Sequence, residues 1–334
     1  DTYLIDAKKR DLFSKNPLMS NKLIEVIASS LKNNEQILLF LNRRGTAKLV
    51  LCSNDTCDWQ ATCPSCDLPM TYHHDLYTLL CHTCGKKIKM PNSCPKCSSK
   101  TDMKSLGSKA IYEDIKSLFP EADIGRYDSD KSDKNSFIED YEQIRTGKIN
   151  ILIGTQQIIK GLDLPKLTTI GILNADLSLN FPDFSSDERT FQLITQALGR
   201  VGRGHTKSKI VVQTFQPTSA IVNKALSEDW HAFKDAEIKS RAEHNFPPFS
   251  FYAKVIFRAK SEKQIIKKAE LCKSDLSSNK NIVVEGPIPS FYAKRGDFYY
   301  YQLIVRSRSR NYLLQALKKC SKDTIIDLDP LTLL

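Results

Sequence analysis

Hydrophobic residues follow two periods that alternate along the first two thirds of the chain. In residues 20–33 they recur every three or four positions on one helical face, behind Ser20, a favoured helix N-cap residue. Other apolar stretches are short continuous runs with the length of buried strands. Predicted strands lie at 3–5, 37–41, 122–127, 150–153, 168–173 and 209–215, and predicted helices at 20–33, 108–118, 134–146 and 186–200. Strands alternating with helices predict an α/β domain with a parallel sheet.

From residue 218 the pattern changes. A charged helical run over 218–243 ends at the sequence FPPF, where the Pro-Pro pair breaks both helix and strand. Beyond it, predicted strands lie at 251–258, 281–285, 299–306 and 324–328, and predicted helices at 260–275 and 309–319. The order strand, helix, strand, strand, helix, strand predicts an α+β, ferredoxin-like domain.

Eight of the ten cysteines lie between residues 52 and 97, in four pairs. Three pairs have C-x2-C spacing, which brings two sulfurs of one turn to a metal ion, and the pair Cys52/Cys57 has C-x4-C spacing. A disulfide framework is the rival interpretation, but a chain of 334 residues without a secretory signal does not favour it. Iron–sulfur ligation is the other alternative. Four repeated cysteine knuckles favour zinc.

Loop lengths suggest how the knuckles pair. The fourteen residues between Cys66 and Cys81 are enough for a hairpin that brings two knuckles together. The expected inner zinc ligands are Cys63, Cys66, Cys81 and Cys84, and the expected outer zinc ligands are Cys52, Cys57, Cys94 and Cys97. Four thiolates fill each tetrahedral site, so we expect two structural Zn²⁺ ions and no metal-activated water.

The chain is basic, with a formal net charge of +11, which favours a polyanionic partner. No apolar run reaches the ~18 residues of a membrane span. No signal peptide is recognisable at the N-terminus. We therefore expect a cytoplasmic protein with no membrane partner.

Three further motifs carry chemistry: LLFLNRRG at 38–45, GTQQIIKGLDLP at 154–165 and QALGRVGR at 196–203. Their order resembles motifs IV, V and VI of superfamily-two helicases, and a cysteine module between the first two resembles the PriA primosomal family (primosomal protein N'). The resemblance runs from about residue 3 to 334. It includes FPDFSSDERTFQLITQALGRVGR at 181–203, FPPF at 246–249, EGPIPS at 285–290 and IDLDPLTLL at 326–334.

The resemblance implies a bacterial, nucleoid-associated, ATP-dependent 3′-to-5′ DNA helicase that restarts stalled replication forks and assembles the primosome. It implies that Arg203 and Arg200 are arginine fingers and that Gln196 approaches the γ-phosphate. Two guanidinium groups three residues apart on one helix face can clamp the charge of a transferring phosphoryl group. Residues that would couple nucleotide state to DNA contact are Thr155, Lys160, Gly161 and Asp163. The family's zinc knuckles also pair as an inner and an outer site.

The sequence departs from the family pattern at four places: the C-x4-C knuckle, Leu162, Asn174 and Ser185. It also lacks the G-x-x-x-x-G-K-[ST] phosphate loop and an acidic DExH-like box. ATP and Mg²⁺ are therefore expected only together with a first helicase lobe, supplied in cis or in trans, and this chain alone is predicted to be inactive. We favour a fragment or a split gene product, because Asp1 stands where the family enters its second lobe.

The expected architecture is a second RecA-like lobe (1–50 and 102–217), a zinc-binding module (51–101) and a C-terminal α+β domain (218–334). Expected partners are forked or single-stranded DNA and primosome and replication proteins. The alternative is a non-enzymatic, zinc-containing module that binds DNA or the primosome. It would use aromatic residues near basic ones to stack bases, although aromatics at strand positions more often pack in a core. These aromatic residues are Tyr72, Tyr77, Phe291, Tyr292, Tyr299, Tyr300 and Tyr301.

Overall fold

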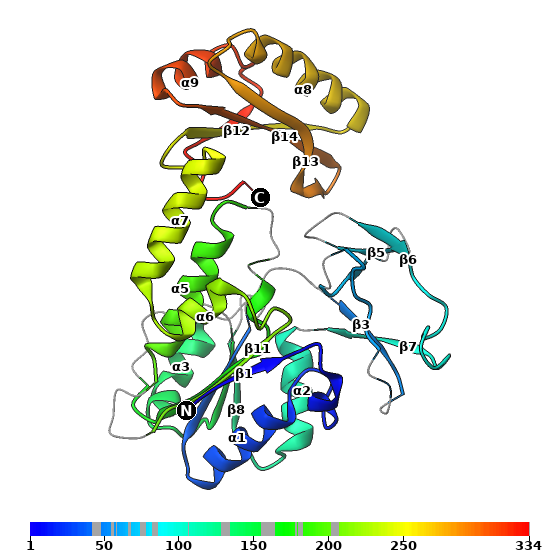
Figure 1. The fold of residues 1–334 in the computed structure, drawn as a ribbon, viewed down its shortest axis with the longest axis vertical. Helices are drawn as coiled ribbons and strands as arrows, with labels where there is room; N and C mark the ends of the chain where they lie inside the picture. Colours follow the sequence, from blue (N-terminus) through cyan, green and yellow to red (C-terminus); the bar gives the residue numbers. More distant parts are fainter. Residues whose placement is uncertain are drawn as a thin grey trace. The chain divides into compact units, whose positions relative to one another are not determined.

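A computed structural model describes most of the chain. The described residues are 1–41, 48–54, 57, 59–65, 68–73, 78–81, 86–105, 107–127, 134–154, 164–177, 179, 183–201 and 207–333. The chain forms two compact units, the first from residues 1–181 and 186–230 and the second from residues 182–185 and 231–334 (Figure 1). It therefore enters the second unit at residue 182, returns to the first at residue 186 and leaves it again after residue 230.

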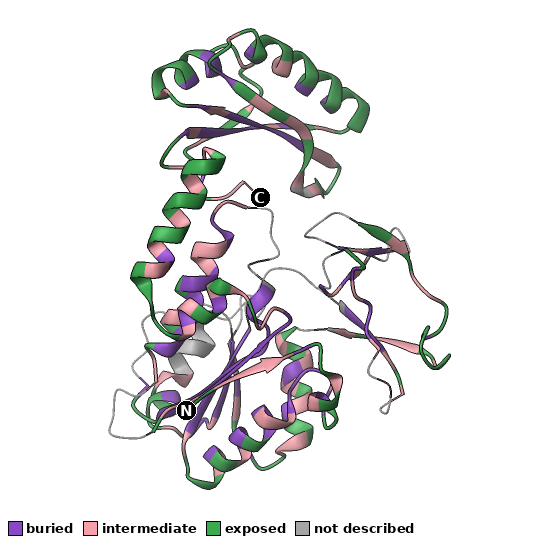
Figure 2. Cartoon of the chain, viewed as in Figure 1, coloured by how far each residue is buried: buried purple, intermediate pink, exposed green. Residues whose placement is uncertain are grey.

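The first unit is built on a six-stranded sheet in the order β1-β11-β10-β2-β9-β8, and every neighbouring pair is parallel. Its strands are β1 (Thr2–Asp6), β2 (Gln36–Phe40), β8 (Ile124–Tyr127), β9 (Ile151–Gly154), β10 (Leu167–Ile172) and β11 (Lys209–Thr214). Every residue of the central strands β2 and β10 is buried (Figure 2). The predicted parallel α/β sheet is confirmed.

The helices of this unit are α1 (Asn21–Lys32), α2 (Ser108–Leu118), α3 (Lys134–Arg145), α5 (Ser186–Leu198) and α6 (Ala220–Leu226), with 3-10 turns η1 (Arg10–Phe13) and η3 (Ala175–Leu177). Buried residues of α1 and α2 form one core with β2 and β9 of the sheet. Ser20 caps α1, because its Oγ accepts the Leu23 amide at 3.2 Å. Leu23 packs so close to β10 that a Cβ at Gly171 would lie 2.7 Å from its Cδ1. A larger residue there would force the Leu23 and Leu39 side chains to shift.

The cysteine-rich segment belongs to the first unit and contains short antiparallel strands. They are β3 (Lys48–Cys52), β4 (Thr71–His73), β5 (Thr78–Leu80), β6 (Lys87–Lys89) and β7 (Thr101–Ser105). β3 pairs with β7, and β4, β5 and β6 form a separate three-stranded sheet. The β4–β5 pair is the hairpin predicted between Cys66 and Cys81.

The second unit contains a four-stranded antiparallel sheet in the order β13-β14-β12-β15. Its elements are β12 (Phe251–Ala259), α8 (Glu262–Ser277), β13 (Val283–Arg295), β14 (Phe298–Ser307), α9 (Arg310–Leu317) and β15 (Ile325–Leu328), and α7 (Trp230–His244) leads into it. Buried residues of α8 and α9, among them Ile265 and Leu313, form one core with Val255 and Leu303 of the sheet. The helices therefore cover one face of this sheet.

Several element boundaries differ from the prediction, and three of them bear on the site or on the domain division. The helical run 218–243 is two helices, α6 and α7, because the chain turns at Glu228, whose φ of 53° is incompatible with a continuous helix. β13 continues to Arg295, well beyond the predicted 281–285. α5 ends at Leu198 and not at residue 200. None of the described helices combines the length and apolar character needed to cross a bilayer.

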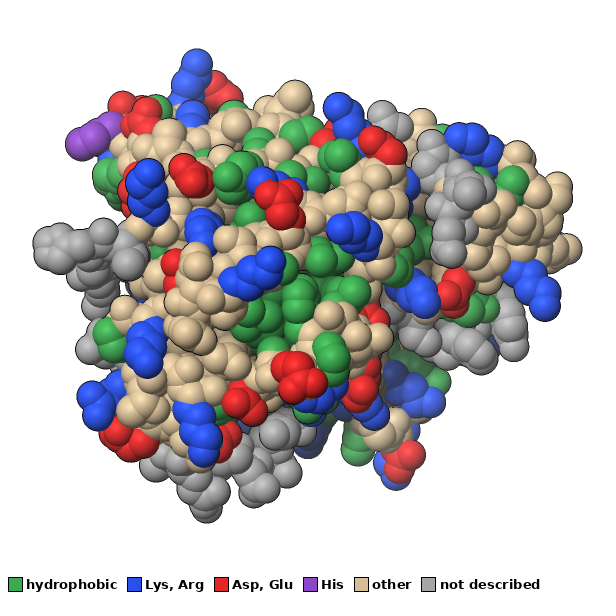
Figure 3. All heavy atoms as spheres, turned by 90° about the horizontal axis from the view of Figure 1, so that it is seen from below, with side chains coloured by type: hydrophobic (Ala, Val, Ile, Leu, Met, Phe, Trp, Pro, Cys, Tyr) green, Lys and Arg blue, Asp and Glu red, His purple; other side chains and the backbone are tan. Residues whose placement is uncertain are grey.

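At least one face of the molecule carries both basic and acidic side chains (Figure 3). Figure 3 shows one face on which Lys and Arg side chains alternate with Asp and Glu side chains around hydrophobic ones. On this face the net charge of the chain does not create a continuous basic surface.

Candidate functional site

The four cysteines of the predicted outer site come together in the structure. The sulfur atoms of Cys52, Cys57, Cys94 and Cys97 all lie within 4.8 Å of one another. The Sγ–Sγ distances are 3.4 Å between Cys52 and Cys97 and 3.7 Å between Cys57 and Cys94. A tetrahedron with Zn–S bonds of about 2.3 Å has sulfur–sulfur edges of about 3.8 Å. The observed separations therefore fit a tetrahedral thiolate site.

Strand pairing brings these distant knuckles together. Cys52 is the last residue of β3 and lies opposite Thr101, the first residue of β7, in the antiparallel register. Thr101 follows the Cys94/Cys97 knuckle, so the β3–β7 pair carries the first knuckle to the last. The Ser53 amide also donates to the Lys100 carbonyl at 2.9 Å, which continues the pairing.

Three of the four knuckles share one turn geometry. The amides of Cys63, Cys81 and Cys94 each donate to the carbonyl five residues later, at 2.7–2.9 Å. The Cys52 amide instead donates to the carbonyl of Trp59, seven residues later. The two extra residues of the C-x4-C spacing therefore lengthen the turn without moving Cys52 out of the cluster.

The thiols of this cluster ionise unequally. Desolvation raises the pKa of the Cys52 thiol to about 12. Hydrogen bonds with Ser99 lower the pKa of the Cys97 thiol to about 6. Four crowded sulfurs cannot all carry negative charge without a cation among them, because like charges within a few ångströms disfavour ionisation. The arrangement is suited to a divalent, thiophilic metal ion such as Zn²⁺, which would be held by four sulfurs and would keep no open coordination position.

Only half of the predicted inner site falls within the described residues. Cys63 and Cys81 are buried in one apolar cluster with Val50, Met70 and Leu79. Cys66 and Cys84 lie outside the described residues. The two described cysteines thus lie in the same apolar cluster as Leu79 of β5, and the pairing of the inner knuckles stays a prediction.

The predicted nucleotide-facing residues are located in part. Gln196 is exposed on α5. Arg200 is not on the helix, contrary to the prediction of two arginines on one helix face, because α5 ends at Leu198. The Arg200 amide donates to the Ala197 carbonyl, three residues back, in the tighter turn that closes the helix. The other predicted residues, Thr155, Lys160, Gly161, Asp163 and Arg203, lie outside the described residues, as does the polar end of LLFLNRRG.

β2, β9 and β10 are parallel neighbours, so their carboxyl ends lie at one edge of the sheet. In the sequence, LLFLNRRG begins inside β2, and GTQQIIKGLDLP begins at the last residue of β9. Parallel α/β sheets bind ligands at this edge. Asp176, just beyond β10, is fully buried there and accepts hydrogen bonds from Thr214 Oγ1 and the Phe215 amide at 2.7 and 2.6 Å. Burial raises the pKa of Asp176, and its hydrogen bonds connect the ends of β10 and β11.

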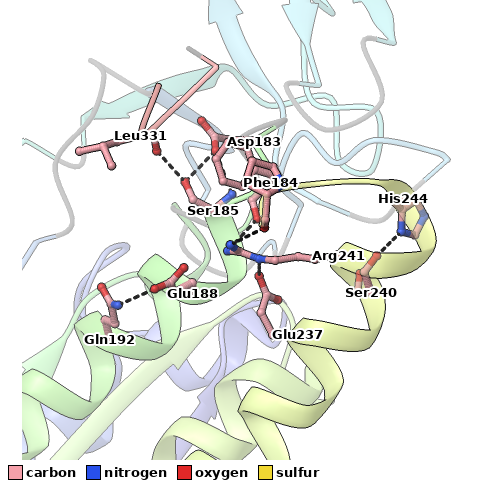
Figure 4. Close-up of polar contacts among 11 residues, drawn as sticks. Asp183, Phe184, Ser185, Glu188, Gln192, Glu237, Ser240, Arg241, His244 and Leu331 are labelled. Carbon is pink, nitrogen blue, oxygen red and sulfur yellow. Dashed lines mark hydrogen bonds and ion pairs between the residues drawn. The ribbon is translucent and has the colours of Figure 1, made fainter. Parts of the chain in front are cut away.

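Residues 183–185, just before α5, belong to the second unit and make a polar junction there (Figure 4). One Asp183 carboxylate oxygen accepts from the Leu333 amide at 2.9 Å and from the Thr332 hydroxyl, and the other accepts from the Ser185 amide and hydroxyl. Burial alone would raise the pKa of Asp183, but these hydrogen bonds outweigh it and lower the pKa.

Phe184 packs in an aromatic cluster within the same unit. Its ring centroid lies 6.0 Å from that of Phe246 and 6.2 Å from that of Tyr252. The Arg241 guanidinium lies 5.3 Å from the Phe184 ring, pairs with Glu237 at 2.6 Å and donates to the Pro247 carbonyl at 3.1 Å. Both members of that ion pair are only 13% exposed, so the pair is well shielded from water.

Three sequence segments that carry the family resemblance therefore meet at one junction: 183–185, 246–247 and 331–333. Asp183, Phe184 and Arg241 are site residues that sequence patterns did not predict. No local periodicity signals a contact between residues nearly 150 positions apart. Ser185 stands where the family pattern has arginine, and its hydroxyl donates a hydrogen bond to the Asp183 carboxylate.

Comparison with known proteins gives three family matches along the chain. Residues 63–89 match the PriA DNA helicase Cys-rich region domain, residues 97–205 match the helicase conserved C-terminal domain, and residues 242–331 match the primosomal protein N C-terminal domain.

Curated relatives match nearly the whole chain. The replication restart protein PriA of Bacillus subtilis is 33% identical over 95% of this chain and 40% of its own length. Those of Chlamydia trachomatis and Rickettsia conorii are 35% and 36% identical, over 99% and 94% of this chain and 46% and 48% of their own lengths. The chain thus spans less than half the length of these relatives.

Similarity to solved structures is weak. The C-terminal domain of the DEAD-box protein Dbp5 is 13% identical, with a TM-score of 0.34 over 73% of this chain and 96% of that chain. The Hef helicase domain of Pyrococcus furiosus is 15% identical, with a TM-score of 0.28 over 58% of this chain and 25% of that chain.

Proposed function

Because this chain belongs to the PriA family of replication restart proteins, we propose that it is the C-terminal part of an ATP-dependent 3′-to-5′ DNA helicase that restarts stalled forks and assembles the primosome. The observation that carries the proposal is the order of the three family matches along the chain, together with a parallel sheet whose cysteine-rich insertion gathers four sulfurs. In this proposal the protein works in the bacterial cytoplasm at the nucleoid, with forked or single-stranded DNA and replication proteins as partners.

The motor role is assigned to residues of two sequence motifs, GTQQIIKGLDLP and QALGRVGR. Arg203 and Arg200 would stabilise charge on the transferring phosphoryl group, and Gln196 would approach the γ-phosphate. Thr155, Lys160, Gly161 and Asp163 would couple the nucleotide to DNA contact. ATP with Mg²⁺ would supply the phosphoryl group, held by a first lobe that carries the phosphate loop absent from this sequence. The exposure of Gln196 and the position of Arg200 past the end of α5 support access to such a lobe.

The test is reconstitution. This chain alone is expected to hydrolyse no ATP, and adding a first lobe is expected to restore DNA-stimulated hydrolysis. Arg203→Ala should lower the rate by about 10³-fold or more, as for other arginine fingers. The control is Arg145→Ala, an arginine on α3 that is half exposed and paired with Glu142 at 3.0 Å. Equal rates in the Arg203→Ala and Arg145→Ala proteins would refute the assignment.

We assign two structural zinc ions to the cysteine-rich segment. The outer ion would be bound by Cys52, Cys57, Cys94 and Cys97, which is supported by their sulfur separations. The inner ion would be bound by Cys63, Cys66, Cys81 and Cys84, which is supported by the shared knuckle turn and by the burial of Cys63 and Cys81 in one cluster. Metal analysis of the purified chain should give two zinc ions. A value of one or none would reject the pairing.

A second candidate function is a non-enzymatic zinc-containing module that binds DNA or primosome proteins. The absence of a phosphate loop from the printed sequence favours it. This module would bind forked DNA without ATP and would gain no hydrolysis from an added first lobe. The reconstitution experiment therefore separates the two candidates.

We also propose a division of the chain into three domains. We place the second RecA-like lobe in 1–50 and 102–217, the zinc-binding module in 51–101 and the C-terminal domain in 218–334. The strand order β13-β14-β12-β15, with two helices on one face, supports a ferredoxin-like C-terminal domain.

A further inference from the structure

Two cysteines outside the cysteine-rich segment lie side by side in the second unit. Cys272 belongs to α8, and Cys320 follows the end of α9, 48 residues later in the sequence. The Cys272 thiol lies 3.7 Å from the Cys320 sulfur and donates a hydrogen bond to it. Both thiols are free and only partly buried, and both pack against the core of the unit. Two distant segments of the chain thus present their thiols to each other.

The packing of α8 and α9 brings these thiols together. Both helices lie on the same side of the four-stranded sheet (Figure 1). Two further contacts join the same segments, because Lys319 Nζ donates to Ser278 Oγ at 3.4 Å and Lys268 lies 4.0 Å from Asp323. In the sequence, Lys268 precedes Cys272 and Ser278 follows it. Contacts on both sides of Cys272 therefore support its approach to the end of α9.

The pair lacks the further ligands of a metal site. Among the residues that the structure describes, the cysteine, histidine and acidic side chains close enough to hold a metal ion in a group of three or more are those of the outer cluster, Cys52, Cys57, Cys94 and Cys97. Two sulfurs alone leave a tetrahedral zinc ion half coordinated. The reaction open to two adjacent thiols without a metal is oxidation to a disulfide.

A disulfide requires only a small movement of the two sulfurs. Its S–S bond is about 2.0 Å long, so the sulfurs of Cys272 and Cys320 would approach each other by about 1.7 Å. A change of χ1 between staggered rotamers moves a cysteine sulfur by about 3 Å. Side-chain rotation is therefore large enough to close the gap.

The two thiols differ in reactivity. The hydrogen bond between them lowers the pKa of the Cys320 thiol and raises the pKa of the Cys272 thiol. Because the thiolate is the nucleophile in thiol–disulfide exchange, Cys320 should react first. Three exposed lysines, Lys318, Lys319 and Lys322, lie next to Cys320 in the sequence and favour the approach of an anionic reactant.

We propose that Cys272 and Cys320 form a redox-sensitive site, which a low-molecular-weight disulfide such as oxidised glutathione converts to an intramolecular disulfide. Cys320 gives its proton to water, and its thiolate attacks one sulfur of oxidised glutathione, which forms a mixed disulfide and releases one glutathione thiolate. Cys272 transfers its proton to that thiolate and attacks the Cys320 sulfur. The second glutathione leaves as a thiolate and takes a proton from water. Two protein thiols are thus oxidised, and one glutathione disulfide is reduced to two thiols.

The new bond would join α8 to the end of α9. A covalent link between residues 48 positions apart restricts the unfolded chain and so stabilises the folded unit. The site shares no residue with the proposed motor and zinc sites. It therefore goes beyond the proposed function, and a failure of either of those assignments would leave it unaffected.

The test treats the 334-residue chain, with zinc present, with oxidised glutathione. Remaining thiols are alkylated, and the chain is digested with trypsin without reduction. Trypsin cuts after Lys268 and Lys319, so the disulfide links the peptides AELCK (269–273) and CSK (320–322). Mass spectrometry should find this linked pair in most chains. The urea midpoint of the second unit should rise by about 1 M or more and should return when dithiothreitol reduces the bond.

Single substitutions separate the two steps. Cys272→Ser keeps the attacking thiol and should stop at the mixed disulfide on Cys320. Cys320→Ser keeps the thiol of higher pKa and should form a mixed disulfide more slowly, by about threefold for each unit of pKa above the pH. Oxidised glutathione should not raise the urea midpoint of either variant. In concentrated urea, where the fold no longer holds the sulfurs together, mixed disulfides should replace most of the linked pair.

Three outcomes would overturn the proposal. Mixed disulfides without the linked pair in the folded chain would show that the two sulfurs cannot join. Unmodified thiols at both positions would identify Cys272 and Cys320 as small packing residues of the core. Disulfides confined to the cysteines at 52–97, with loss of zinc, would place the sensitivity to oxidation in the cysteine-rich segment instead.

Discussion

The cysteine-rich segment and the C-terminal unit both contain antiparallel sheets, but different interactions hold them together. Among the described residues, the apolar cluster of the cysteine-rich segment has six buried members, two of which are cysteines. The C-terminal core has thirteen, supplied by long strands and two helices. A small cluster buries too little apolar surface to offset the conformational entropy of its chain. The comparison leads us to expect that a metal ion bound by the four gathered sulfurs compensates for the small cluster in one region and that no such cross-link is needed in the other.

Removing one metal ligand should give the largest difference in stability between the cysteine-rich segment and the C-terminal unit. Cys94→Ser removes a buried sulfur of the outer cluster and should reduce zinc by one ion per chain. Because structural zinc contributes on the order of 10 kcal/mol to small domains, the β3–β7 pair should lose its hydrogen-exchange protection. Amides of β14 should keep theirs. Cys320→Ser, in the C-terminal unit, is the control and should leave zinc content unchanged. Retained protection in β3 and β7 would show that apolar packing suffices there.

Removing a core side chain from the C-terminal unit should destabilise that unit and leave the cysteine-rich segment unaffected. Leu303 is fully buried between the sheet and its helices. Leu303→Ala should lower the free energy of unfolding of the C-terminal unit by about 2–5 kcal/mol and leave zinc content unchanged. Urea-induced unfolding provides the measurement. Leu271→Ala, at a position 61% exposed on α8, is the control and should change stability by less than about 0.5 kcal/mol.

The polar junction should contribute less than the core. Asp183→Ala leaves the Leu333 amide and the Ser185 and Thr332 hydroxyls without their acceptor, which should cost about 1–3 kcal/mol. Asp323→Ala removes an exposed carboxylate of the same unit and should be nearly neutral. Urea unfolding of both variants makes the comparison, and equal stabilities would mean that solvent replaces the junction at no cost.

The junction should also respond to pH. Since folding lowers the pKa of Asp183, the stabilisation is present above the ordinary aspartate value of 3.8 and is lost as pH falls through the lower value of the folded state. The stability difference between the wild-type chain and Asp183→Asn should therefore be constant from about pH 7 to about pH 5 and shrink below about pH 4. A difference that grows with acidity would contradict the assigned direction of the shift.

An exposed ion pair should have the smallest effect. Lys268 and Asp323 lie 4.0 Å apart and are 59% and 79% exposed, so water and salt screen their attraction. A double-mutant cycle with Lys268→Ala and Asp323→Ala should give a coupling free energy below about 0.5 kcal/mol. A coupling comparable to the Asp183 effect would show that surface charge also stabilises the C-terminal unit.

Much of the fold could be predicted because local signals are strong. Ser20 begins α1, α2 has the predicted bounds of 108–118, and the buried runs became neighbouring parallel strands. Cysteine spacing and one loop length were enough to predict that Cys52 and Cys57 meet Cys94 and Cys97. These features depend on residues close in sequence or on a chemically rare residue type.

The rest depends on contacts that no local pattern records. The break at Glu228 requires a left-handed residue inside a charged run, and the early end of α5 follows from the turn at Gly199 and Arg200. The junction at Asp183 needs the last residues of the chain to cross the second unit. Periodicity reports which side of an element is buried but not which distant segment buries it.

The second unit is built from two separate stretches of the chain, residues 182–185 and 231–334, so it is not formed by C-terminal residues alone. A protease cut or a cloning boundary near residue 230 would still leave Asp183, Phe184 and Ser185 attached to the remaining piece, stripped of the carbonyl, amide and aromatic neighbours that surround them. Truncation would thus expose a hydrophobic ring and an acid directly in front of α5. Chimeras between relatives should exchange this tripeptide together with the C-terminal unit, as one cassette of two separate stretches.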